Sequence, residues 1–347
     1  MSQRLIFTNE VAAAVTSLVS ELAPASVHIV TDTTVARQVL PLLGLPYPVV
    51  AVPAGDINKT IENVSAIWRA LSNGGATRRS LVINIGGGMV TDMGAFAAAT
   101  FKRGVRFINV PTTLLGAVDA AVGGKTGCNL DGLKNEVGVF APADAVVISS
   151  AFFATLPPSE LLSGYAEMVK HGLLEGPAEF SRLIAGNPLD LTPAELLTLL
   201  EENVRTKSRI VAEDPTEKGI RKALNLGHTI GHAFETLGFE KNAPVPHGYA
   251  VAHGLLVELI LSHLHRGFPS SELHRYRDFM RRAGYGTLSV SCDDYPRLLE
   301  LMTHDKKNAT PDAISFTLLD APGSPQTGIV LPRDLILSAL DIYRELL

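Results

Sequence analysis

Three histidines and one glutamate between residues 167 and 247 have the residue types of a metal site. His228 and His232 are four residues apart, so a helix would place both side chains on one face. His247 follows them, and Glu167 stands within a stretch of helical pattern. Histidine and carboxylate are common ligands of zinc-like metals, although any single histidine is more often a core or surface residue. No glutamate lies between His228 and His232, which excludes the HExxH motif of zinc proteases.

A glycine run in the first half has the pattern of a phosphate-binding loop. Gly86, Gly87 and Gly88 follow an apolar run at 81–85 and precede a helical pattern. Glycines at such a place let the backbone approach a pyrophosphate, and the helix N-terminus supplies free N–H groups. The run does not match the GxGxxG fingerprint, and a plain tight turn explains it about equally well. Asp92, on the expected first turn of that helix, could contact a ribose or nicotinamide, or simply face the positive end of the helix dipole.

Polar residues also follow the other expected strands. They are Asp32, Asp56, Lys59, Thr112 and Thr113. An acid at a strand end is suited to bind ribose hydroxyls, although a turn-forming aspartate is the commoner case. Several strand ends with polar side chains favour a ligand site more strongly than any one of them does.

Basic residues recur beside glycine and asparagine in a chain of low charge. Lys125 follows two glycines and Lys134 precedes Asn135, so both are suitably placed for a phosphate or carboxylate. A solvated side chain is the usual explanation of any single lysine. The full set is Arg103, Lys125, Lys134, Lys170, Lys207, Arg221, Lys306 and Lys307.

Alternating patterns predict the elements that position these residues. Strand-like and helical runs alternate in the first half, which predicts βαβ units, a parallel sheet and ligands at the carboxyl ends of its strands. After about residue 156 the pattern is mainly helical. We therefore expect an α/β fold, with a Rossmann-like NAD-binding domain over 1–154 and a mostly helical metal- and substrate-binding domain over 155–347. The expected strands are 27–31, 49–53, 81–85, 105–110, 314–319 and 328–331, and the expected helices 11–22, 61–71, 161–174, 193–211, 223–237, 249–266, 271–283 and 332–346.

The composition narrows the class of protein. The chain has 347 residues, 46% of them hydrophobic and 19% charged, with a net charge of −5. This excludes intrinsic disorder, makes a nucleic-acid partner improbable and gives by itself no reason to expect an anionic ligand. No apolar run reaches the roughly 18 residues of a membrane span. Cys128 and Cys292 form neither a disulfide framework nor a CxxC metal site, so we expect a cytoplasmic protein without membrane partners.

Taken together, these motifs resemble the 3-dehydroquinate synthases of the sugar-phosphate cyclase superfamily. The resemblance runs from about residue 32 to 308, which is nearly the whole chain, and motifs this long and ordered are highly specific. The matching stretches are GGGMVTDMGAFAAATFKRG (86–104), PTTLLGAVDAAVGGKTGCNLDGLKNEVGVF (111–140), TLPPSELLSGYAEMVKHG (155–172), KSRIVAEDPTEKGIRKALNLGHTIGHAFE (207–235), HGYAVAHG (247–254) and DKKN (305–308).

The resemblance implies an activity and a set of ligands. The substrate would be 3-deoxy-D-arabino-heptulosonate 7-phosphate and the product 3-dehydroquinate, within the shikimate pathway of aromatic amino acid biosynthesis. The enzyme would hold NAD and a divalent metal, zinc or alternatively cobalt. Glu167, His228 and His247 would be the metal ligands, whereas His232 would contact the substrate phosphate or move protons.

The resemblance also implies roles for the other site residues. Asp32, Asp56, Lys59, Gly87, Gly88, Asp92, Thr112, Thr113 and Thr155 match NAD-binding positions, and Lys134 lies near both cofactor and substrate. Asp119, Lys125, Asn135, Lys170, Lys207, Arg221, Asn225 and one of Lys306 and Lys307 match the substrate pocket. Glu217 would orient cations of the pocket. Arg103 would reach the phosphate site of a partner subunit, since the family is commonly a homodimer.

The implied reaction explains these residue types. NAD accepts a hydride from C5, phosphate leaves from C7, the hydride returns, and ring opening with an intramolecular aldol closure forms the carbocycle. The metal acts as a Lewis acid on the substrate oxygens. A substrate with a carboxylate and a phosphate accounts for the lysines and arginines.

Three positions depart from the family pattern. Asp56 stands where a glutamate is usual, and Tyr249 and His253 stand where glutamate and an apolar residue are frequent. We interpret His253 as a residue of helix packing.

Other functions fit less well. Cyclases that use other sugar phosphates tend to alter the residues corresponding to Lys170, Arg221 and Asn225, which are all present here. A metal-dependent polyol dehydrogenase would accumulate NADH, and a non-catalytic relative would be expected to lack site residues.

Overall fold

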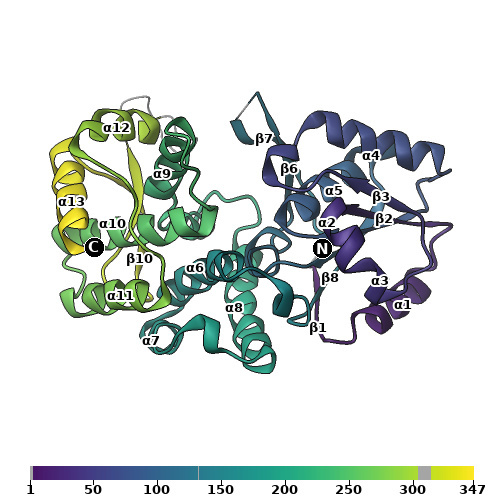
Figure 1. Cartoon of the computed structure of the whole chain (residues 1–347), viewed down its shortest axis with the longest axis horizontal. Helices are drawn as coiled ribbons and strands as arrows, with labels where there is room; N and C mark the ends of the chain where they lie inside the picture. The colour runs from purple at the N-terminus through teal and green to yellow at the C-terminus, as the bar shows by residue number, and fades with distance from the viewer. Residues whose placement is uncertain (1–2, 132, 304–313) are drawn as a thin grey trace. The chain divides into compact units, whose positions relative to one another are not determined.

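A six-stranded parallel sheet forms the centre of the first unit of the chain (Figure 1). The computed structural model describes residues 3–131, 133–303 and 314–347. The strand order is β1 (Arg4–Phe7), β8 (Ala145–Ile148), β5 (Arg106–Pro111), β4 (Leu81–Gly86), β2 (Val27–Asp32) and β3 (Val49–Val52). Every position of β2, β4 and β8 is buried, as expected for a parallel sheet that is covered on both faces. The predicted α/β architecture is therefore confirmed.

The strand order identifies the edge of the sheet where a ligand would bind. The chain passes from β2 to β3 on one side, whereas β4, β5 and β8 continue on the other side. Ligands of open α/β sheets bind where the strand order reverses, at the carboxyl ends of the strands. That point lies at the ends of β2 and β4, where Asp32 and the glycine run at 86–88 stand. Helix α5 (Gly88–Thr100) begins there and packs against β2, β4 and β5.

The remaining elements of this unit include several that the sequence analysis did not predict. Helices α1 (Val11–Leu22) and α4 (Ile61–Asn73) agree with their expected ranges, while α2 (Thr33–Gln38) and α3 (Leu40–Leu43) are additional. Strands β1 and β8, with four residues each, were not predicted. A two-stranded antiparallel hairpin, β6 (Lys125–Leu130) with β7 (Leu133–Phe140), was also missed.

The second unit is mainly helical. Its helices are α6 (Pro158–Glu175), α7 (Pro177–Leu183), α9 (His228–Glu240), α10 (His247–Arg266), α11 (Ser270–Ala283), α12 (Tyr295–Thr303) and α13 (Arg333–Leu346). An antiparallel pair of strands, β9 (Ser315–Leu319) and β10 (Pro325–Val330), packs beside α10. Among the described residues, no helix combines the length and apolar character needed to cross a bilayer.

One of the boundaries between the two units lies within a helix. The first unit comprises Met1–Pro157 and Thr192–Ser208, and the second comprises Pro158–Leu191 and Arg209–Leu347. Helix α8 (Pro193–Glu213) thus belongs to the first unit over most of its length. The sequence analysis assigns all of this helix to the second domain, because local patterns do not show which core a helix packs against.

The helix predicted over 223–237 is wrong at its start. The chain forms a 3₁₀ segment, η6 (Ile220–Asn225), and a new helix α9 begins at His228. Gly227 between them has a φ of +80°, which favours glycine, and its N–H donates to Glu258 Oε2 at 2.6 Å. This break makes His228 the first residue of α9, so its buried ring lies at the start of the helix rather than along its middle.

Two glycines of α10 allow three helices to approach one another closely. A Cβ atom on Gly248 would lie 1.9 Å from the Ser163 carbonyl of α6, and one on Gly254 would lie 2.1 Å from the Gly227 carbonyl. The Gly248 N–H also donates to Ser163 Oγ at 3.0 Å. These approaches bring together the helices that carry Glu167 and His247.

His253 packs inside the second unit, as the sequence analysis interprets it. Its ring is completely buried, with Nδ1 2.9 Å from the Tyr343 hydroxyl and Nε2 3.4 Å from the Tyr285 carbonyl. The neutral ring satisfies both contacts, because Nε2–H donates to the carbonyl and Nδ1 accepts from the hydroxyl. Burial lowers the pKa of His253 from 6.5 to about 4.

This buried ring predicts a loss of stability in acid. Because the unfolded histidine binds its proton more tightly, stability rises with pH from about 4 to 6.5 and is lost as pH falls through that window. The shift corresponds to about 3 kcal/mol. We expect His253→Gln, which keeps a donor and an acceptor, to show a flatter dependence of the unfolding free energy on pH across this range. The unfolding free energy of both proteins is measured by urea denaturation at each pH. An equal change of this free energy with pH in the wild type and in His253→Gln would contradict the expectation.

Candidate active site

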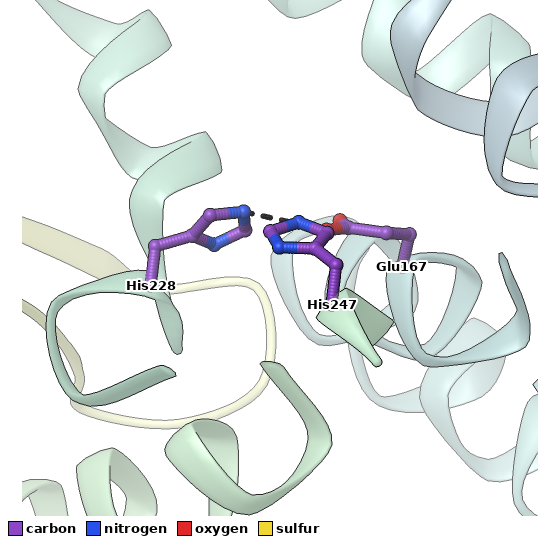
Figure 2. A group of neighbouring side chains, drawn as sticks. All are labelled: Glu167, His228 and His247. Atoms are coloured by element: carbon purple, nitrogen blue, oxygen red, sulfur yellow. Dashed lines mark ion pairs between the residues drawn. The ribbon is translucent and has the colours of Figure 1, made fainter. Parts of the chain in front are cut away.

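Three side chains of the second unit converge at one point (Figure 2). Glu167 comes from the middle of α6, while His228 and His247 are the first residues of α9 and α10. Their donor atoms all lie within 4.8 Å of one another. Glu167 Oε1 is 3.3 Å from His228 Nε2 and 3.7 Å from His247 Nε2.

The carboxylate of this cluster is suited to hold a cation. Glu167 is completely buried, and neither of its oxygens has a hydrogen-bond partner of ordinary geometry. Burial disfavours its charge, but the neighbouring Lys170 and His228 hold the pKa of Glu167 well below its ordinary value. Oε2 is paired with the Lys170 ammonium, so Oε1 is the oxygen that faces the two imidazoles. One carboxylate and two imidazole nitrogens form a common donor set for zinc.

The outward nitrogens of both histidines also have partners. His228 Nδ1 lies 3.1 Å from the Leu226 carbonyl, and His247 Nδ1 lies 3.4 Å from Glu235 Oε2. Burial opposes the positive charge of His247, but its contacts with Glu167 and Glu235 raise its pKa to about 10. A metal ligand must be a neutral imidazole, so a divalent cation bound here would compete with a proton on this ring.

His232 lies beside this cluster but outside the donor set. Its ring centroid is 5.3 Å from that of His228 and 5.9 Å from that of His247. The two histidines four residues apart do share a helix face, as predicted. The donor atoms that converge nevertheless belong to His228 and His247, together with Glu167.

The predicted cofactor residues of the first unit lie at the carboxyl ends of its strands. Asp32 ends β2, and its Oδ1 accepts the N–H groups of Thr34 and Val35, so it caps α2. Gly88 begins α5, and no side chain caps this helix start. A Cβ atom on Gly87 would lie 3.1 Å from Thr113 Cγ2, so the loop is closely packed at this point. The N–H of Thr112 donates to the Gly86 carbonyl at 2.9 Å.

A second group of predicted residues surrounds Lys59. Its ammonium donates to Asp92 Oδ2 on α5 and to Asn135 Oδ1 on β7, each at 2.5 Å. Lys134 pairs with Asp56 at 3.3 Å. Asp92 stands on the second turn of α5 rather than on the predicted first turn, because the helix begins at Gly88. The structure therefore joins the loop after β3, helix α5 and the hairpin through these side chains.

The other predicted residues of the first unit are more dispersed. Lys207 of α8 is buried and donates to the backbone carbonyl and Oδ1 of Asp119, at 2.5 and 2.6 Å. Lys125 begins β6, and Thr155 ends the 3₁₀ segment η4 (Phe153–Thr155). Arg103 lies in η2 (Phe101–Arg103), which follows the last residue of α5. The rise of the helix places it about 20 Å from Gly88, where α5 begins. Helix α5 thus separates Arg103 from the glycine loop at 86–88.

The polar residues around η6 form a connected group in the second unit. Arg221 is 2% exposed, and its Nη1 donates to the Pro215 carbonyl at 2.8 Å. Asn225 Nδ2 donates to Glu217 Oε1 at 2.9 Å. Asp214, which the sequence analysis did not single out, accepts the N–H groups of Lys218, Gly219 and Arg221. Its place just after a helix, before proline, is a turn signal that could have identified it. Lys306 and Lys307 lie outside the described residues.

The sequence comparisons with known proteins agree on one family. The sequence profile of the 3-dehydroquinate synthase N-terminal domain matches residues 49–163, and that of the C-terminal domain matches residues 164–308. A 3-dehydroquinate synthase from Parabacteroides distasonis is 46% identical over 99% of this chain and 98% of its own length.

Solved structures of related cyclases have the same fold. A 2-epi-5-epi-valiolone synthase from Streptomyces hygroscopicus, with NAD⁺ and Zn²⁺ bound, is 26% identical with a TM-score of 0.87, over 99% of this chain and 97% of that one. A 2-deoxy-scyllo-inosose synthase in complex with carbaglucose-6-phosphate, NAD⁺ and Co²⁺ is 24% identical with a TM-score of 0.86, over 98% and 96%.

Proposed function

Because the chain belongs to the 3-dehydroquinate synthase family, we propose that Glu167, His228 and His247 hold the divalent metal of that family's reaction. The protein is an enzyme that converts 3-deoxy-D-arabino-heptulosonate 7-phosphate to 3-dehydroquinate and phosphate. The observation that carries the site assignment is the buried, anionic carboxylate of Glu167 with two imidazole nitrogens facing one of its oxygens.

The cofactors are NAD and a divalent metal, zinc or cobalt, as in the structural relatives. When bound, the metal supplies a Lewis acid for the substrate oxygens and NAD supplies a reversible acceptor for the hydride of C5. Lys170 pairs with Glu167 through Oε2, which leaves Oε1 directed at the histidines. Lys170 can therefore balance the carboxylate without occupying the position between the ligands.

The residues at the carboxyl end of the sheet are proposed to bind NAD. The uncapped start of α5 offers backbone N–H groups to a pyrophosphate, and Gly87 and Gly88 provide the close approach. Lys59 fixes the orientation of Asp92 by a buried contact. The ribose contacts are proposed for Asp32 and Asp56, with Thr112, Thr113, Lys134 and Thr155 completing the cofactor set.

The cations of the two units are proposed to bind the carboxylate and phosphate of the substrate. Arg221 and Lys170 belong to the second unit, whereas Lys207 and Lys125 belong to the first. Lys207 is oriented by Asp119, and Asn225 is oriented by Glu217. His232 is proposed to hold the phosphate or transfer a proton, because its ring stands beside two metal ligands.

We further propose that the enzyme is a cytoplasmic homodimer. Arg103 supports the dimer, because it follows the end of α5 opposite to Gly88 and matches an arginine that serves a partner's phosphate site. The two cysteines support a reducing compartment, since Cys128 and Cys292 are both free thiols.

Mixing two inactive variants tests the role of Arg103. Arg103→Ala and Glu167→Gln chains are expected to have little activity alone. In a hybrid dimer, one site would combine an intact Glu167 with an intact Arg103 from the other chain, so co-expression should restore about half of the wild-type activity per hybrid dimer. Phosphate release by the separated hybrid is the measurement. A hybrid as inactive as its parents, while remaining dimeric, would contradict contribution in trans.

A further inference from the structure

We propose that Glu235 is a positioning residue of the metal site, which orients the ring of His247 through its outward nitrogen. Glu235 lies on α9, seven residues after His228, and is 4% exposed. Residues His228, His232 and Glu235 follow the i, i+4, i+7 spacing of one helix face. One face of α9 thus carries a ligand, the neighbouring His232 and the carboxylate that contacts the other histidine ligand.

The contact of Glu235 with His247 has the geometry of a carboxylate–histidine–metal arrangement. Glu235 Oε2 lies 3.4 Å from Nδ1 of His247, and Nε2 of the same ring faces Glu167. A carboxylate on the outward nitrogen fixes the tautomer, leaves the lone pair on the inward nitrogen and increases the basicity of the ring. The inference rests on the proposed function, because it takes His247 as a metal ligand.

The two histidines are held in different ways. The outward nitrogen of His228 contacts the backbone carbonyl of Leu226 at 3.1 Å, so no side-chain substitution removes its partner. The outward nitrogen of His247 depends on a side chain. Like His228, His247 begins its helix and therefore lacks a preceding helical turn that would confine its ring. A buried carboxylate costs free energy unless it is paired, and the imidazole provides such a partner.

Zinc affinity of the purified full-length chain, measured by competition with a chromogenic chelator, tests this role. We expect Glu235→Ala to weaken zinc binding about 10- to 100-fold. Glu235→Gln should weaken it less, because the amide carbonyl still accepts the Nδ1–H bond but lacks the charge. Glu240→Gln is the matched control, since Glu240 ends the same helix and pairs with Arg297 at the surface. It should bind zinc as the wild type does.

Spectra of the cobalt-loaded proteins separate positioning from a general loss of structure. A reoriented His247 should change the visible d–d absorption of bound Co²⁺ in Glu235→Ala, with partial rescue in Glu235→Gln and NAD⁺ binding unchanged in both. Unchanged zinc affinity and cobalt spectrum in Glu235→Ala would overturn the proposal, even if its stability falls. If Glu235→Ala does not fold, zinc affinity and the cobalt spectrum are measured in Glu235→Gln instead. Wild-type values of both in Glu235→Gln would then overturn the proposal. If Glu167→Gln binds zinc as tightly as the wild type, the failure lies with the proposed metal site itself.

Discussion

Glu167→Gln is expected to lose its tightly bound divalent metal and nearly all phosphate-releasing activity. The substitution preserves shape but removes the charge of the oxygen that faces His228 and His247. A Lewis acid contributes several kcal/mol to stabilising the transition state, so we expect kcat to fall on the order of 1,000-fold or more. Metal content after gel filtration, together with the rate of phosphate release, measures both losses.

The controls for this prediction separate metal loss from misfolding. Glu167→Gln leaves the buried Lys170 without its partner carboxylate, which is itself destabilising. The double variant Glu167→Gln, Lys170→Met removes both charges and should fold, yet remain free of metal. Glu175→Gln, at the end of the same helix and paired with Arg209 at the surface, should keep wild-type metal content. A folded Glu167→Gln enzyme with one bound zinc and near wild-type turnover would refute the assignment.

Arg221→Ala is expected to reduce kcat/KM for the heptulosonate phosphate about 100- to 1,000-fold. This is the size of effect expected when one partner of a buried charge pair is removed. The guanidinium is almost fully buried and is held by the Pro215 carbonyl and the loop that Asp214 organises. We expect most of the loss in KM, because a bound anionic group of the substrate loses its partner. Arg221→Lys should restore little, since an ammonium cannot form two parallel hydrogen bonds with a carboxylate.

A surface arginine provides the comparison for Arg221. Arg209→Ala removes an exposed partner of Glu175 in the same unit and should leave the steady-state constants unchanged. An Arg221→Ala enzyme whose kcat/KM stays within tenfold of the wild type would show that this cation does not contact the substrate.

The spacing of apolar residues predicted the strands that are buried throughout and the helices that have one buried face. The strands that became β2 and β4 and the helices that became α1 and α4 have clear apolar patterns, and the structure confirms them. The hairpin of β6 and β7 was missed because its first strand, KTGCNL, is mostly polar and has no clear apolar pattern. The dipeptide Asp131-Gly132 within it is a known hairpin signal, and Asp131 does adopt a positive φ of 50°.

The break before His228 shows why local patterns fail at the site. The apolar pattern continues through 223–237, but Gly227 adopts a left-handed conformation and Glu258, 31 residues later, accepts its N–H. Such a long-range cap has no local signal. The partner of His247 was also missed, although Glu235 follows His228 at helical spacing and this could have been read from the sequence.

Net charge and local charge give different information about ligands. A net charge of −5 gave by itself no reason to expect an anionic ligand, yet the residues proposed for the substrate include Lys170, Lys207 and Arg221, all buried. Each lies beside a carboxylate or carbonyl that orients it. Overall charge describes solubility and long-range fields, whereas these cations act over a few ångströms.

One incubation tests the central claim most directly. The enzyme is mixed with 3-deoxy-D-arabino-heptulosonate 7-phosphate, NAD⁺ and Zn²⁺ or Co²⁺, while phosphate and the absorbance of NADH are recorded together. We predict continuous phosphate release without net accumulation of NADH, abolished by a chelator and restored by either metal. NADH formed in proportion to the substrate consumed, or no phosphate release from this substrate, would contradict the account.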